Sequence, residues 1–211
     1  MRILFYGDSI TDADRTREPV GPDTRLGSGF VAYAASKLYE RDFEKYEVYN
    51  RGVSGNRIVD LYARVKKDCW NIQPDVLNIL VGVNDIWHEL QYENGVEVQR
   101  FEKIYNMLLE DTKKALPNTK IIICEPFVLN GTATEENIDK FLEVKEYAKV
   151  ARRLAEKFGA YYVPLQNKFD EMGERYGNSK MLADGVHPTL RGSVVLANEW
   201  LKVFDKVEAE I

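Results

Sequence analysis

The chain has 211 residues, of which 45% are hydrophobic and 11% aromatic, enough for one sizeable core but short for two. We therefore expect a single domain that spans residues 1–211. The formal net charge is −5, and the sequence has no cluster of lysine and arginine that could form a basic patch. Both features argue against nucleic acid as a partner.

The first apolar run, residues 3–6, is much shorter than the core of a signal peptide, and no run approaches the length of a membrane span. These features predict a cytoplasmic protein with no membrane partner. Cys69 and Cys124 agree with that compartment, because their spacing suggests neither a disulfide framework nor a metal site. We expect both thiols to be reduced and partly buried.

Short runs rich in valine and isoleucine alternate along the chain with longer stretches of helical period. The runs predict strands at 2–6, 47–50, 75–82, 119–126 and 160–165. The periodic stretches predict helices at 30–40, 56–69, 96–116, 138–159 and 190–207. This βαβα alternation indicates a three-layer α/β/α sandwich around a five-stranded parallel sheet, and the nearly continuous apolar third and fourth strands are typical of such a sheet.

The segments that follow the strands are long and are expected to be loops: 7–29, 84–95, 126–137 and 166–189, the last with room for a short helix. Ligands of open α/β sheets bind at the carboxyl ends of the strands. We therefore expect the functional side of the molecule at these loops.

Four short blocks lie just after predicted strands or near the final helix: 7–11 (GDSIT), 52–56 (GVSGN), 82–87 (GVNDIW) and 184–189 (DGVHPT). A serine hydroxyl needs a base to remove its proton, and histidine is the usual base near neutral pH. Asp184 lies three residues before His187, close enough to accept a hydrogen bond from the imidazole. Ser9, Asp184 and His187 are therefore a candidate catalytic triad.

An attacked carbonyl oxygen becomes an oxyanion, which needs preorganised hydrogen-bond donors. Glycine lets its backbone N–H approach a ligand closely, which makes Gly55 a candidate donor. The Asn84 amide and the backbone N–H of Ser9 are two further candidates.

In this order, the blocks resemble the SGNH or GDSL-type family of esterases and acylhydrolases. The stretches FYGDSITDADR, LGSGFVAY, RGVSGN and VGVNDIW are most similar to intracellular bacterial acetylxylan esterases and related carbohydrate acetylesterases. The resemblance runs from residue 3 to about residue 200 and implies a flavodoxin-like fold. It implies Ser9 as the nucleophile, Gly55 and Asn84 as oxyanion-hole donors, and Asp184 and His187 as the rest of the triad.

The same resemblance implies a short-chain ester as substrate, above all acetyl on a xylose-based oligosaccharide. It implies no metal and no organic cofactor. Because some members of that group form ring-like oligomers, it also makes a homo-oligomer an expectation for this chain.

Several side chains beside the blocks are candidate substrate contacts. Aromatic rings suit the apolar faces of sugars, so Trp87, Tyr92 and Phe127 are candidates, although a core role is equally compatible with each. Asp8 and Val186 complete this set, and Asp8 is expected to support the loops by hydrogen bonds rather than to react. His88 is predicted to be an exposed loop histidine, and the loop arginines, Arg15, Arg17, Arg25 and Arg57, are predicted to be solvated or paired with loop carboxylates.

Three alternatives remain at this level. A lysophospholipase or thioesterase would use the same triad on longer acyl chains. Asp8, Asp12 and Asp85 could supply oxygen ligands to a metal ion, which makes metal-assisted phosphate chemistry a second alternative. Against it, the chain has no Gly-Lys-Ser/Thr loop and no second histidine at metal-ligand spacing. A non-catalytic flavodoxin-like binding module would leave the co-occurrence of the four blocks unexplained.

Overall fold

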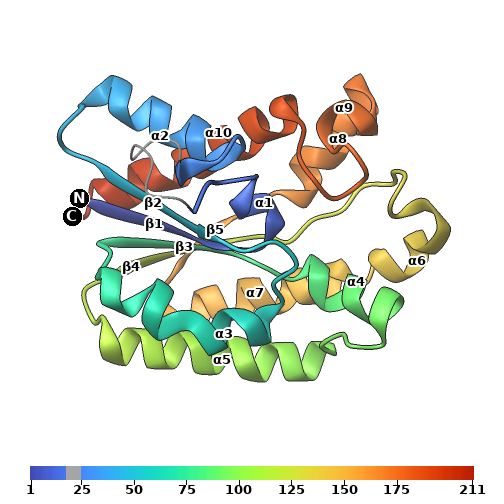
Figure 1. Ribbon diagram of the computed structural model, residues 1–211, viewed down its shortest axis with the longest axis horizontal. Coiled ribbons are helices and arrows are strands. Elements are labelled where there is room, and N and C mark those ends of the chain that lie inside the picture. The colour runs from blue at the N-terminus through green and yellow to red at the C-terminus, as the bar shows by residue number, and fades with distance from the viewer. Residues whose placement is uncertain (18–24) are drawn as a thin grey trace.

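The computed structural model describes residues 1–17 and 25–211 (Figure 1). Within these ranges, five strands form one parallel sheet in the order β2-β1-β3-β4-β5. The strands are β1 Arg2–Gly7, β2 Glu47–Gly52, β3 Val76–Leu80, β4 Lys120–Cys124 and β5 Tyr161–Val163. The predicted five-stranded parallel sheet is confirmed, and part of the expected 7–29 loop, residues 18–24, lies outside the described residues.

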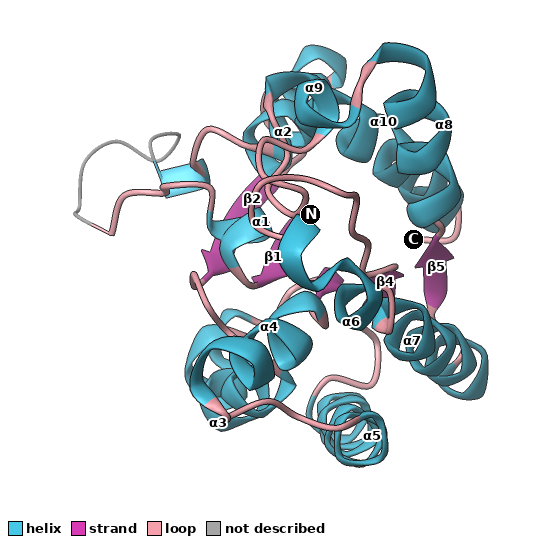
Figure 2. Ribbon diagram, turned by 90° about the vertical axis from the view of Figure 1, so that its right-hand side faces the viewer, coloured by secondary structure: helices cyan, strands magenta, loops and turns pink. Residues whose placement is uncertain are grey.

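Helices cover both faces of the sheet, as the views in Figures 1 and 2 show. One face carries α2 (Phe30–Arg41) and α10 (Leu190–Glu208), and the other carries α3 (Ile58–Asp68), α5 (Val98–Ala115) and α7 (Val144–Phe158). The remaining helices are α1 (Ser9–Asp12), α4 (Val83–Tyr92), α6 (Ile138–Phe141), α8 (Gln166–Tyr176) and α9 (Asn178–Met181), with 3₁₀ helices at Trp70–Ile72 and Glu135–Asn137.

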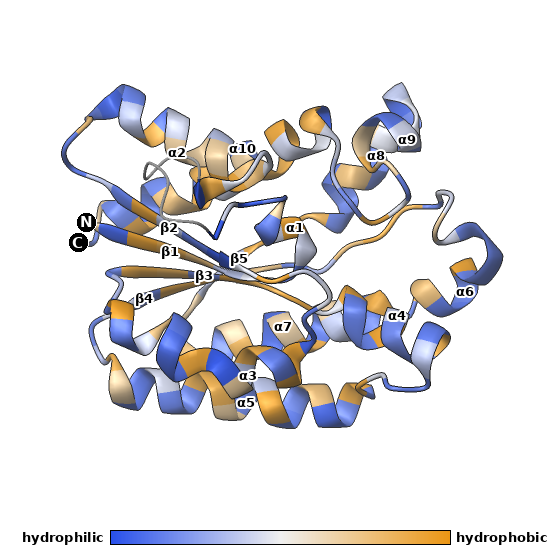
Figure 3. Ribbon diagram, in the orientation of Figure 1, coloured by the Kyte–Doolittle hydropathy of each residue, from blue (hydrophilic) through white to orange (hydrophobic). Residues whose placement is uncertain are grey.

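The strands β1, β3 and β4 are buried along nearly their whole length because they are apolar on both sides, and Figure 3 shows hydrophobic colour along them. Every residue of β3 is buried. Its one polar side chain, Asn78, accepts hydrogen bonds from Trp200 Nε1 (3.0 Å) and Cys124 Sγ (3.1 Å), which pairs the amide oxygen, whereas Nδ2 has no partner among the described residues. Both cysteines are free and buried.

Three segments differ from the prediction. The expected loop 84–95 is largely the helix α4, whose buried Val83 and Ile86 lie one turn apart and which ends at Glu93 in a left-handed conformation (φ 50°). The predicted helix 138–159 is divided by a turn into α6 and α7, and the segment after Leu165 holds α8 and α9. The side chain of Glu125 fixes the start of α8 by accepting hydrogen bonds from the backbone N–H groups of Leu165 and Gln166.

The register of the central strands brings the ends of three strands to one level. Gly7 is the partner of Gly52 in β2 and of Leu80 in β3. Because the strands are parallel, the segments that follow them leave the sheet side by side. These segments hold three of the four sequence blocks.

Candidate active site

Ser9 is the first residue of α1 and follows β1 directly after Asp8. The Asp8 carboxylate caps this short helix by accepting a hydrogen bond from the Ile10 N–H (3.0 Å). A Cβ at position 7 would collide with the Thr11 side chain and the Leu80 carbonyl, so only glycine permits the turn. This packing fixes Ser9 at the carboxyl end of the sheet with a partly exposed side chain.

His187 and Asp184 lie in the segment between α9 and α10 and reach Ser9 from the other end of the chain. Ser9 Oγ is 2.9 Å from His187 Nε2, and His187 Nδ1 is 2.7 Å from Asp184 Oδ2. The second carboxylate oxygen of Asp184 accepts hydrogen bonds from the backbone N–H groups of Val186 (2.9 Å) and His187 (2.8 Å). The structure thus places the serine, the imidazole and the carboxylate in one hydrogen-bonded series.

The electrostatics of this series suit a histidine that accepts a proton. Partial burial pushes the pKa of Asp184 up, but the hydrogen bonds from the His187 ring and from two backbone N–H groups outweigh it and lower the pKa to about 2. The hydrogen bond to Asp184 raises the pKa of His187 above its ordinary value, against partial burial, which lowers it. Asp184 therefore stays ionised near neutral pH and stabilises the protonated imidazole.

Gly55 and Asn84 lie in the segments that follow β2 and β3. Gly55 has a φ of +80°, a conformation that favours glycine. Its N–H donates no backbone hydrogen bond within the described part of the chain. Asn84 Nδ2 donates to the Asn56 carbonyl (3.1 Å), and an amide nitrogen carries a second N–H, so one donor is left over.

Asp12 connects the serine helix to the Gly55 segment. Its Oδ2 accepts a hydrogen bond from the Ser54 N–H (3.1 Å) and forms an ion pair with Arg17 Nη2 (2.6 Å). Arg15 donates to the Gly52 carbonyl (2.8 Å), so two of the loop arginines bind within the site's own framework. Arg17 accords with the prediction that the loop arginines are solvated or paired with loop carboxylates, whereas Arg15 binds a backbone carbonyl instead.

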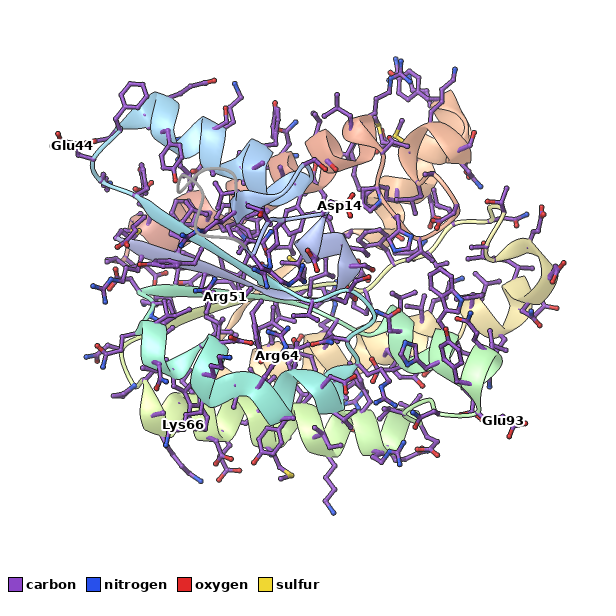
Figure 4. All side chains as sticks on the ribbon, in the orientation of Figure 1. Asp14, Glu44, Arg51, Arg64, Lys66 and Glu93 are labelled. Atoms are coloured by element: carbon purple, nitrogen blue, oxygen red, sulfur yellow. The ribbon has the colours of Figure 1, made fainter. Side chains whose placement is uncertain are left out.

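A cavity of about 640 Å³ opens beside Ser9 and His187. Its polar lining includes the hydroxyls of Ser28, Ser54 and Ser193, the carboxylates of Asp12 and Asp14, and Arg17, and Figure 4 shows Asp14 close to α1. The apolar part of the lining is smaller: Ile10, Ala13, Pro188 and Leu190. A cavity of this size with several polar groups suits a small, hydroxyl-rich ligand.

The helix α4 carries two of the predicted aromatic contacts. Trp87 lies with its ring centroid 5.8 Å from that of His187 at an interplanar angle of 47°, and its other neighbour is Phe141. Tyr92 is 61% exposed and packs edge-on against His88. Trp87 therefore touches the candidate base, whereas Tyr92 lies one helical turn further out.

Three predicted substrate contacts have buried side chains. Phe127 is completely buried and stacks on Phe169 with a centroid distance of 4.3 Å. Val186 is completely buried, and Asp8 is 1% exposed with its carboxylate at the start of α1. A ligand in the cavity cannot reach any of the three side chains, so the structure corrects their expected substrate contacts. The other expectation for Asp8, that it supports the loops by hydrogen bonds, agrees with its bond from the Ile10 N–H.

His88 was expected in an exposed loop but lies on α4, one turn after Asn84. A Cβ built on Gly55 would be 3.7 Å from His88 Nε2, so the ring lies against the candidate oxyanion-hole glycine. Partial burial, with the nearby charge of Arg57, lowers the pKa of His88. The spacing of four residues from Asn84 would have revealed this position had the segment been predicted as a helix.

The three carboxylates that the sequence offered as metal ligands have other partners. Asp8 caps α1, Asp12 binds Ser54 and Arg17, and Asp85 accepts a hydrogen bond from the Ile58 N–H (3.1 Å). Burial, with the nearby charge of Asp8, raises the pKa of Asp85. Residues 1–17 and 25–211 contain no group of three or more His, Cys, Asp and Glu side chains arranged to hold a metal ion. No helix in these ranges is both long and apolar enough to cross a membrane.

Comparison with known proteins supports the resemblance drawn from the four blocks. The model of the GDSL-like lipase/acylhydrolase family matches residues 5–194. The acetylxylan esterase of Geobacillus stearothermophilus is 32% identical over 207 residues, which cover 95% of this chain and 92% of that protein.

Solved structures give the same result. The crystal structure of the Geobacillus acetylxylan esterase matches with a TM-score of 0.85 at 32% identity over 95% of this chain and 92% of that one. A protein described as a GDSL-like lipase from Parabacteroides merdae matches with a TM-score of 0.90 at 41% identity over 96% and 94%. The chain therefore belongs to the GDSL-like lipase/acylhydrolase family and is a carboxylic ester hydrolase.

Proposed function

We propose that this hydrolase is a serine acetylesterase that deacetylates xylo-oligosaccharides or related acetylated sugars. The observation that carries the proposal is the hydrogen-bonded series Ser9–His187–Asp184 at the wall of a cavity with both polar and apolar lining. Its relative from Geobacillus is named an acetylxylan esterase and an acetyl-xylooligosaccharide esterase. Crystal structures of catalytic mutants of that enzyme, one with a serine and one with an aspartate replaced by alanine, are also among the similar structures.

In the proposed mechanism, His187 Nε2 removes the hydroxyl proton of Ser9 as Oγ attacks the acetyl carbonyl. The carbonyl oxygen becomes an oxyanion, which accepts hydrogen bonds from the N–H groups of Ser9 and Gly55 and from Asn84 Nδ2. His187 then passes the proton to the sugar oxygen, which leaves as an alcohol. The acetyl group remains on Ser9.

The second half of the reaction repeats these roles with water. His187 removes a proton from the water as its oxygen attacks the acetyl-serine carbonyl, and the same donors hold the second oxyanion. Proton transfer from His187 to Ser9 Oγ releases acetate. Asp184 remains ionised throughout, in keeping with its lowered pKa.

The cavity lining favours an acetyl sugar over a long acyl chain. The exposed hydroxyls of Ser28 and Ser54, the Asp14 carboxylate and the Arg17 guanidinium offer hydrogen bonds to sugar hydroxyls. A fatty acyl chain would instead need a continuous apolar wall, because burying a methylene group contributes about 0.8 kcal/mol only against apolar surface. This contrast makes the lysophospholipase or thioesterase the second candidate.

The test compares the wild-type protein, Ser9→Ala and the control Ser36→Ala on p-nitrophenyl esters from acetate to octanoate. Ser36 is an exposed residue of α2. We expect activity that is highest on acetate, persists in EDTA, survives in Ser36→Ala and is lost in Ser9→Ala. NMR of acetylated xylo-oligosaccharides then shows whether acetate is released, and from which hydroxyl.

Other results select other functions. A rate that rises with chain length would support the lysophospholipase or thioesterase. Unchanged turnover in Ser9→Ala would refute the serine mechanism. Binding of xylo-oligosaccharides without turnover of any ester would support the non-catalytic binding module.

A further inference from the structure

Arg64 lies on α3, a helix whose amphipathic pattern gives no sign that this residue belongs to the site. Its side chain is only 17% exposed. Figure 4 shows Arg64 where α3 faces the sheet, on the side of the sheet opposite α2 and α10. An arginine that is largely removed from water needs partners for its five N–H groups, so its contacts show what it holds.

The Arg64 guanidinium contacts the ends of two neighbouring strands. Nη2 donates to the Gly7 carbonyl at the end of β1 (3.0 Å), and Nη1 donates to the Arg51 carbonyl in β2 (2.9 Å). The guanidinium carbon lies 4.3 Å from the centre of the Tyr6 ring, which adds a cation–π contact. The plane of the group is thereby fixed against the sheet.

The same guanidinium also reaches the segment that holds Gly55. Its Nε donates to Asn56 Oδ1 (2.7 Å), and the Asn56 carbonyl accepts the hydrogen bond from Asn84 Nδ2 (3.1 Å). Gly7 lies two residues before Ser9, and Asn56 directly follows Gly55. One planar group thus connects the nucleophile strand with both of the other oxyanion-hole donors.

We propose that Arg64 is a positioning residue that sets the spacing between Ser9 and the oxyanion hole, an inference that rests on the proposed serine mechanism. Hydrolysis requires Ser9 Oγ and the three N–H donors to meet one carbonyl group, and a misplacement of 1 Å can cost about 10²-fold in rate. A guanidinium holds its donors in a rigid plane, whereas an ammonium is a compact charge on a flexible stem. Only arginine can therefore hold these carbonyls and the Asn56 amide in one fixed geometry.

The first experiment measures kcat and KM of Arg64→Lys on p-nitrophenyl acetate, at a temperature where circular dichroism shows the variant to be folded. We expect kcat to fall on the order of 10-fold to 100-fold with KM changed by less than about two-fold, because Arg64 does not touch the cavity. The acid limb of the pH profile stays in place, since no contact of Arg64 involves His187 or Asp184.

Two controls separate positioning from helix stability. Asp68→Asn removes the ion pair that Arg64 makes within α3 (3.0 Å) and leaves its contacts with the site. Arg152→Lys alters an arginine of α7 that lies over a tyrosine ring in the same way, 4.7 Å from the ring centre of Tyr162 in β5. Both variants should keep the wild-type kcat, and a loss in either equal to that of Arg64→Lys would overturn the proposal.

The second experiment combines Asn56→Ala with Arg64→Lys in a double-mutant cycle. Asn56→Ala removes the side-chain link to Arg64 but keeps the backbone carbonyl that binds Asn84, so it tests the proposal even if Arg64→Lys fails to fold. We expect Asn56→Ala to lower kcat about 10-fold and the double variant to be little worse than Arg64→Lys alone, because residues in one network are not additive. Full additivity, or wild-type kcat in Asn56→Ala, would refute the proposal.

Failure of this inference is distinct from failure of the proposed function. A folded Arg64→Lys with wild-type kcat, alongside an inactive Ser9→Ala, would remove the positioning role and keep the serine mechanism. Activity that persists in Ser9→Ala would remove both.

Discussion

The indole of Trp87 lies against the imidazole of His187, with ring centroids 5.8 Å apart and planes inclined at 47°. The other neighbour of the indole is the buried ring of Phe141, which it meets edge-on at a centroid distance of 5.7 Å. His187, the proposed base, is therefore held by the Asp184 hydrogen bond at Nδ1 and by the indole beside its ring. This contact makes Trp87 both a support for His187 and a reporter of its charge.

Trp87 should report the protonation of His187 through its fluorescence, because a protonated imidazole quenches a neighbouring indole. We expect intrinsic fluorescence to fall as pH decreases through the His187 pKa, and we expect Trp87→Phe to abolish this titration. Trp70 and Trp200 remain in the variant as the background signal. An unchanged titration in Trp87→Phe would place the quenched indole elsewhere.

The acid limb of activity should lie above the ordinary histidine pKa. The hydrogen bond to Asp184 raises the pKa of His187, and only the neutral imidazole can accept the Ser9 proton. Activity is therefore lost as pH falls through the raised pKa. In Asp184→Asn, we expect the acid limb to move to lower pH and kcat to fall about 10⁴-fold, as measured by pH-dependent kcat/KM and kcat.

A matched control is Asp14→Asn, which removes a cavity carboxylate that raises the pKa of His187 less than Asp184 does. Its acid limb should move in the same direction by a smaller amount. An equal displacement in the two variants would contradict the dominant role of the Asp184 hydrogen bond.

Asn84→Ala should lower kcat about 10²-fold to 10³-fold with little change in KM, because the amide donates to an oxyanion that exists only during the reaction. Asn84 is 5% exposed, and its remaining side-chain hydrogen bond is to Asn56. The measurement is steady-state kinetics on p-nitrophenyl acetate, with melting temperature as a check on folding. A rise in KM at constant kcat would assign Asn84 to substrate binding instead.

Asp8→Asn should stabilise the fold at high pH. Complete burial raises the pKa of Asp8 from 3.8 to about 7, so the folded protein retains a proton that the unfolded chain has lost. Below pH 3.8, burial of Asp8 therefore does not lower the free energy of unfolding of the wild-type protein. As the pH rises from there to about 7, this free energy falls, and above about pH 7 the decrease stays constant. Asparagine keeps an oxygen for the Ile10 N–H but has no charge to bury.

Urea unfolding at pH 4 and pH 8 measures this difference. We expect the two proteins to be similar at pH 4 and Asp8→Asn to be more stable at pH 8, by on the order of a few kcal/mol. Equal stability at pH 8 would show that the buried carboxylate is better solvated or paired than its surroundings indicate.

Serine-directed and thiol-directed reagents should act differently on the native protein. Cys69 and Cys124 are buried, and burial raises the pKa of both thiols, that of Cys69 to about 12. We expect a fluorophosphonate to add once, at Ser9, and iodoacetamide to leave the native mass and activity unchanged. Intact-mass spectrometry measures both, and the unfolded chain, which should take up two carbamidomethyl groups, is the control.

The positions of the strands could be predicted because each is a short apolar run, and a run of Val and Ile between turn residues has few other stable structures. The α4 segment was predicted as a loop because Asn84, Asp85, His88 and Glu89 are polar and its apolar positions are few. It is helical because Val83 and Ile86 pack on the core and because Gly82, with a φ of +142°, lets the chain turn into a helix at the end of β3. Tertiary packing outweighed a weak local pattern.

The side chains around the site show a similar division. Ser9, Asp184 and His187 could be named as a candidate triad from sequence because acyl transfer needs a nucleophile, a base and a carboxylate, and the four blocks contain them in a recognisable order. Val186 lies within the last block and Phe127 lies in the segment that follows β4, yet both side chains are buried, since position in sequence does not fix the direction of a side chain. In the sequence, Arg64 is not distinguishable from any other arginine of a helix. Its role follows only from the fold, in which its side chain donates a hydrogen bond to the carbonyl of Gly7, 57 residues away.

The sequence by itself determined the alternation of strands and helices, the four blocks and the chemistry they supply, because these depend on residue type and local spacing. The tertiary structure alone decided that Ser9 Oγ and His187 Nε2 lie 2.9 Å apart, that Trp87 packs on the base and that Arg64 joins the nucleophile strand to the Gly55 segment. These relationships depend on the level at which parallel strands end and on which buried polar groups find partners. Both are settled only when the whole sheet is packed.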